Sequence, residues 1–156
     1  MTYHTRFRRI DRRTKDATKR LVLGWSQLQE WERVDRCGAW LREVSEIYGM
    51  RPPQLVMAYE DPTVGSGCYF PVANRLCLPH ASIVTLLHEF RHAMQAQGKA
   101  GRHYRAGQAL EARGGAEDDA RAWSLSLYWT VAPRSFRRMV GAGRILFITT
   151  DDLTAV

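Results

Sequence analysis

Cysteine is scarce in this sequence, which has only Cys37, Cys68 and Cys77 among its 156 residues. An odd number of cysteines without a Cys-x-x-Cys pair argues against a secreted scaffold held by disulfides and favours a cytoplasmic protein. Long hydrophobic runs are absent too, since none approaches the roughly 18 apolar residues of a membrane span. The first residues also lack the apolar core of a secretory signal, so we expect neither export nor membrane insertion.

Disorder is equally unexpected, because hydrophobic residues make up 45% and aromatic residues 10% of the chain. Such a composition supports a packed core, and the length suits one domain. No internal repeat and no second domain is evident in the sequence. We therefore expect one folded domain that carries the function.

Positive charge is abundant but unevenly placed. The chain has 23 Lys and Arg against 16 Asp and Glu, and residues 1–20 hold eight of the basic side chains against two acidic ones. Residues 21–156 are nearly neutral, with 15 basic and 14 acidic side chains. The sequence therefore predicts a basic, flexible arm over residues 1–20 and a domain over residues 21–156. Such an arm is suited to binding nucleic acid through its phosphates.

Hydrophobic periodicity and turn residues predict a mixed order of helices and strands. Helices are expected at residues 21–48 with breaks at Gly24 and Gly38, and at 83–97, 116–130 and 134–140. Strands are expected at residues 55–59, 67–70, 75–78 and 145–150. The two middle strands form a hairpin that places Cys68 opposite Cys77, either as two small buried thiols or as a cross-strand disulfide.

The motif that carries chemistry lies in the helix expected at residues 83–97. His88, Glu89 and His92 form an His-Glu-x-x-His sequence, and on a helix the two histidines lie about 40° apart and one turn along the axis. Two imidazoles in this arrangement can bind one Zn²⁺, while Glu89 is near enough to act as general base on a metal-bound water. The opposite face of this helix is apolar, which predicts that it packs on a core.

This motif resembles that of the zincin metallopeptidases. The metzincin extension is absent, because Gln95 and Gly98 stand where that pattern has Gly and a third His. Residues 117–124 are similar to the Glu-x-x-Ala-x-x-[Phe/Trp]-[Ala/Ser] helix of gluzincin-type enzymes, in particular the small ImmA/IrrE-like peptidases. The resemblance implies that Glu117 is the third zinc ligand. Arg121 departs from the family pattern, which often has Asp at that position.

Other residues compete for the third ligand position. Asp118 and Asp119 neighbour Glu117, although Asp119 points the opposite way on a helix. His103 is the ligand if the chain instead resembles the SprT-like zincins, which use a third His and act near DNA. Candidates for stabilising the transition state are His103, Tyr104 and Tyr128.

The sequence thus predicts an α+β fold of the minimal zincin type. We expect a small, mostly antiparallel sheet with a hairpin packed on the His-Glu-x-x-His helix, and a second helix that carries the third ligand. The predicted function is hydrolysis of peptide or protein substrates by a zinc-bound water with Glu89 as base. The alternative is a DNA-associated regulatory protein that uses the basic arm, either a SprT-like protease or an inactive zincin-fold binding module.

Overall fold

Helices dominate the structure, a computed structural model that describes residues 10–101 and 115–145. In chain order the described elements are α1 (Arg12–Val22), the short 3₁₀ helix η2 (Trp25–Gln27), α2 (Glu30–Ile47), β1 (Gln54–Met57), β2 (Cys68–Phe70), β3 (Arg75–Leu78), α3 (Ile83–Ala96), α4 (Gly115–Val131) and α5 (Pro133–Gly141). The predicted α+β class is confirmed. The strand expected at residues 145–150 lies outside the described residues after Ile145.

The three strands form one small sheet in the order β1-β3-β2. β2 and β3 form the predicted antiparallel hairpin, with Cys68 opposite Cys77, and both cysteines are free thiols. The expectation of a mostly antiparallel sheet is wrong, because β1 pairs with β3 in parallel. After β1, residues 58–67 lead to β2, and β3 then lies between β1 and β2. β2 is therefore an edge strand.

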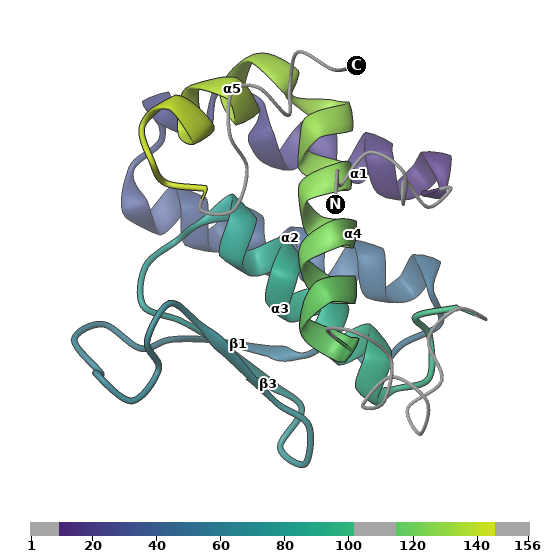
Figure 1. The fold of residues 1–156 in the computed structure, drawn as a ribbon. Coiled ribbons are helices and arrows are strands. Elements are labelled where there is room, and N and C mark those ends of the chain that lie inside the picture. Colours follow the sequence, from purple (N-terminus) through teal and green to yellow (C-terminus); the bar gives the residue numbers. More distant parts are fainter. Residues whose placement is uncertain (1–9, 102–114, 146–156) are drawn as a thin grey trace.

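The helices lie on one side of this sheet (Figure 1). α3 is central, because it contacts α2, α4, β2 and β3. Ser82 caps its first turn by accepting a hydrogen bond from the backbone N–H of Thr85, and the predicted apolar face (Ile83, Leu87, Phe90 and Met94) is buried. Burial of these side chains fixes α3 in the core and leaves its other face for polar side chains.

The N-terminal helix α1 corrects the predicted domain boundary. Asp11 caps α1, and four residues spaced along one face (Thr14, Ala17, Thr18 and Leu21) are buried against α2 and α4. The indole Nε1 of Trp40 also donates a hydrogen bond of 3.0 Å to Thr18. Residues 10–20 are therefore part of the folded domain, because the basic side chains that suggested an arm share a helix with a buried stripe. Residues 1–9 lie outside the described residues.

The two glycines expected to break the first long helix behave differently. Gly24 has a φ of 66° and separates α1 from η2, whereas Gly38 lies inside α2. A left-handed φ favours glycine at position 24, while a single glycine inside a helix is tolerated. In the described ranges, no helix is both long and apolar enough to cross a membrane.

Candidate metal centre

Helices α3 and α4 bring His88, His92 and Glu117 together. The Nε2 atoms of the two histidines are 3.2 Å apart. One carboxylate oxygen of Glu117 lies 3.1 Å from Nε2 of His88, and the other lies 3.0 Å from Nε2 of His92. Among the described residues, this is the one group of His, Cys, Asp or Glu side chains arranged to hold a metal ion.

The spacing of these three donors fits a zinc ion. With metal–ligand bonds of about 2.0–2.1 Å, the ligand atoms of a tetrahedral site lie roughly 3.3 Å from one another. The shortest separations are 3.0 to 3.2 Å, with a different oxygen of Glu117 facing each histidine, and one ligand atom from each residue lies within 4.8 Å of the others. Burial, and then the neighbouring His92, lower the pKa of His88, which favours the neutral imidazole that a metal requires. The donor set of two imidazoles and one carboxylate is therefore suited to Zn²⁺.

The other candidate ligands lie in different surroundings. Asp118 forms an ion pair of 3.3 Å with Arg121. Asp119 is buried and forms an ion pair of 2.7 Å with Arg91 on α3, so it is not one of the three donors. His103 lies outside the described residues, as does Tyr104. Within the described structure it is Glu117 that joins the two histidines.

Tyr128, a predicted transition-state stabiliser, is buried in the core at 2% exposure. Its hydroxyl forms a hydrogen bond of 2.7 Å with the hydroxyl of Ser135 on α5. It lines neither of the two hollows next to the histidines. The structure therefore does not bring Tyr128 to the centre.

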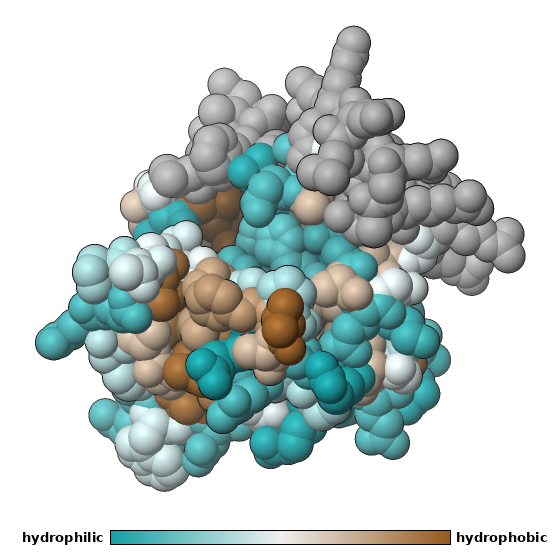
Figure 2. Space-filling model, turned by 90° about the horizontal axis from the view of Figure 1, so that it is seen from below, coloured by the Kyte–Doolittle hydropathy of each residue, from teal (hydrophilic) through white to brown (hydrophobic). Residues whose placement is uncertain are grey.

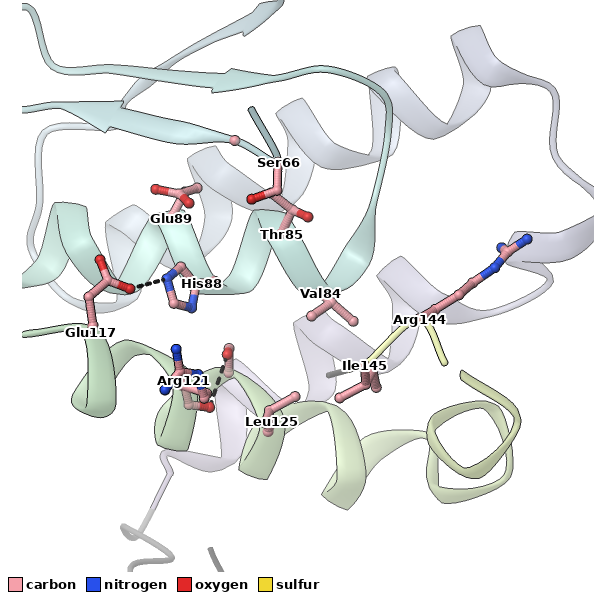
Figure 3. Close-up of a pocket in the computed structure, with 12 residues that line it drawn as sticks. Ser66, Val84, Thr85, His88, Glu89, Glu117, Arg121, Leu125, Arg144 and Ile145 are labelled. Carbon is pink, nitrogen blue, oxygen red and sulfur yellow. Dashed lines mark hydrogen bonds and ion pairs between the residues drawn. The ribbon is translucent and has the colours of Figure 1, made fainter. Parts of the chain in front are cut away.

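Glu89 lies beside the two histidines on α3 and is only 7% exposed. No hydrogen bond from the described part of the chain reaches its carboxylate, which lies on the side of α3 that faces the strands (Figure 3). Burial raises the pKa of Glu89 from 4.5 to about 7, with His92 opposing and Glu117 adding to the rise. A carboxylate with a pKa near neutrality is suited to accept and return a proton.

The burial of Glu89 predicts how the stability of the metal-free protein varies with pH. The unfolded chain loses this proton near pH 4.5, whereas the folded chain holds it until about pH 7. Unfolding therefore releases a proton between these values, so stability falls as pH rises through this window and is constant above it. The free energy of unfolding should fall by at most about 3 kcal/mol across this window. In urea unfolding, Glu89→Gln should match the parent at pH 4 and be more stable at pH 8; matching stabilities at both pH values would contradict this assignment.

Two hollows meet at this centre and share Gly67, Glu89 and Glu117 in their walls. The first hollow, about 410 Å³ in volume, passes His88 and reaches an apolar end formed by Val84, Leu125 and Ile145 (Figure 3). The second hollow, about 490 Å³, passes His92 and is walled by the edge strand β2. Because the hollows lie on either side of the three donors, a bound chain could continue in both directions from them.

The edge strand approaches α3 very closely at Gly67. A Cβ atom at this position would lie 2.4 Å from Cγ2 of Thr85, and the φ of 144° also favours glycine.

The face of the molecule below the sheet carries hydrophobic side chains among hydrophilic ones (Figure 2). Phe70 and Val72, in and just after β2, are among the exposed hydrophobic side chains. The strand thus lies next to the centre with its outer edge unpaired in the described structure.

Two functional features were missed by the sequence reasoning. Gln95 was noted only as a mismatch to the metzincin pattern, yet its Oε1 lies 2.8 Å from Nδ1 of His92. Its place one turn after His92 is a signal that helix geometry offers. Gly67 carries no comparable signal, because its close approach to Thr85 depends on how the sheet packs on α3.

Comparison of the chain with protein-family models, with curated proteins and with solved structures finds no match.

Proposed function

We propose that this protein is a zinc-dependent peptidase of the small gluzincin type, with zinc held by His88, His92 and Glu117. The observation that carries the proposal is the place of these donors. The nearest atoms of the three side chains lie 3.0 to 3.2 Å apart, next to the buried carboxylate of Glu89, where two hollows meet. A metal centre between two hollows suits a substrate that extends on both sides of the bond to be cleaved.

Zinc bound to this donor set would lower the pKa of a water molecule and polarise the carbonyl of the substrate. Glu89 is positioned to accept the proton of the attacking water and to deliver it to the leaving amine. Its burial, at 7% exposure, would keep bulk solvent away from both proton transfers. The carboxylate of Glu117 would contribute a negative charge. A site with this charge would bind a divalent cation more favourably than a site of three neutral ligands.

The unpaired edge of β2 supports a peptide as the substrate. An extended peptide that adds to this edge would run along the second hollow and pass over Glu89 and His92. Backbone hydrogen bonds would then supply affinity without regard to sequence. A side chain of the peptide could enter the apolar end of the first hollow, near Val84, Leu125 and Ile145.

Zinc-dependent cleavage of an unfolded protein tests this function. The purified chain loaded with one equivalent of Zn²⁺ should cut a reduced, alkylated substrate into discrete peptides, detected by mass spectrometry. Removal of zinc with a chelator should abolish cleavage, and added zinc should restore it. Cleavage that persists after zinc has been removed would contradict the proposal.

A further inference from the structure

Behind His92 lies a chain of buried polar side chains that connects α3 to α4. Gln95 (7% exposed), Asp119 (6%) and Arg91 (3%) are buried. Nε of Arg91 lies 2.7 Å and its Nη2 lies 3.2 Å from the two carboxylate oxygens of Asp119. Arg91 is fixed further by a hydrogen bond of 2.8 Å to the carbonyl of Ala100. This bidentate pair holds Asp119 as a fixed acceptor.

The amide group of Gln95 has one orientation that satisfies its neighbours. Its Nε2 donates hydrogen bonds of 2.9 Å both to the carbonyl of Ala116 and to Oδ2 of Asp119. Both of those atoms are acceptors only, so they need the NH₂ end of the amide. The carbonyl oxygen Oε1 of Gln95 is thereby turned towards Nδ1 of His92, at 2.8 Å.

We infer that Gln95 is a positioning residue that sets the tautomer of His92. Because Oε1 of Gln95 can only accept, its hydrogen bond with His92 requires a proton on Nδ1 of the ring. With a metal ion bound, the lone pair of Nε2 would then be directed at the ion, in the cluster with His88 and Glu117. This is the tautomer that a metal ligand bound through Nε2 must have, and hydrogen bonds of this kind orient ligating histidines.

Gln95 also has a second positioning role, at the third donor. Its bond to the carbonyl of Ala116 reaches the residue directly before Glu117. One side chain therefore orients a ligand of α3 and fixes the backbone next to a ligand of α4. The inference rests on the proposed metal centre but does not require that the centre cleave peptides.

The test is the zinc affinity of Gln95→Met, measured by competition with a chromogenic chelator on the full chain. Methionine keeps the length of the side chain and removes its hydrogen bonds to His92, Ala116 and Asp119. We expect the affinity for zinc to fall by about 10- to 100-fold.

Gln97→Met is the matched control. Gln97 makes three similar amide hydrogen bonds two residues later, with Arg51 and Asn74, so its variant should lose stability while keeping its zinc affinity.

A second measurement needs no variant of Gln95. In ¹⁵N NMR spectra of the metal-free chain, with His92 assigned by comparison with His92→Gln, Nδ1 of His92 should carry a proton. An unprotonated Nδ1, or equal zinc affinities for Gln95→Met and the parent, would overturn the inference. If the chain binds zinc in this Gln95-dependent way but cuts no substrate, the proposed peptidase is wrong and the inference stands.

Discussion

Glu89→Gln should abolish peptide cleavage and leave zinc binding intact. Glutamine has nearly the shape of glutamate but cannot accept the proton of the attacking water. Loss of a positioned general base typically slows a reaction by about 10²- to 10⁴-fold. The three donors His88, His92 and Glu117 are unchanged, so the variant should still bind one zinc per chain. The rate of cleavage and the zinc content, measured on the same preparation, check both parts.

A matched control for this variant is Glu46→Gln, which makes the same change at an exposed position on α2. It should retain the parent's rate of cleavage. Substantial cleavage by Glu89→Gln would show that another group removes the proton. A variant that loses zinc together with activity would place Glu89 among the ligands and contradict its role as base.

Glu117→Gln should weaken zinc binding more than any other single change in α4. The variant keeps the shape of the side chain and removes the charge that lies within 3.1 Å of both histidines. Because loss of a hydrogen-bond partner of a ligand already costs about 10- to 100-fold in affinity, loss of a ligand should cost at least about 100-fold. Since the Glu117 side chain is 65% exposed, the stability of the metal-free protein should change by less than about 0.5 kcal/mol.

Asp118→Asn is the control, because it removes a carboxylate from the adjacent residue. Asp118 is engaged by Arg121 at 3.3 Å and should contribute little to zinc affinity. Chelator competition on the two variants side by side separates the predicted ligands. If Asp118→Asn loses zinc and Glu117→Gln keeps it, the third ligand has been assigned to the wrong residue.

Much of the site was predictable because it depends on local geometry. The helical period alone places His88 and His92 one turn apart with Glu89 between them, and the apolar residues opposite fix which face is buried. The same period predicts that Asp119 points away from Glu117, and in the structure Asp119 pairs with Arg91 instead of joining the donors. These relations hold within one helix, whatever the rest of the chain does.

The remainder depends on contacts between distant segments. The parallel pairing of β1 with β3 follows from the path of residues 58–67, which hydrophobic patterning does not encode. The packing of α1 in the domain was not predicted, because its many basic residues indicated a solvent-exposed arm. Its buried face consists largely of small and polar side chains, including Thr14 and Thr18, which hydrophobic patterning does not detect. The partner of Asp119 lies on another helix, at Arg91, and a pairing across 28 residues has no signal in a single sequence.

The most direct test of the metal centre is the set of ligands around zinc in crystals grown with Zn²⁺. Diffraction data collected at the zinc absorption edge should show one strong anomalous peak in the cluster. It should lie about 2.0–2.2 Å from Nε2 of His88, Nε2 of His92 and a carboxylate oxygen of Glu117. No peak at the cluster, or a peak at which Asp118 or His103 replaces Glu117, would contradict the centre described here.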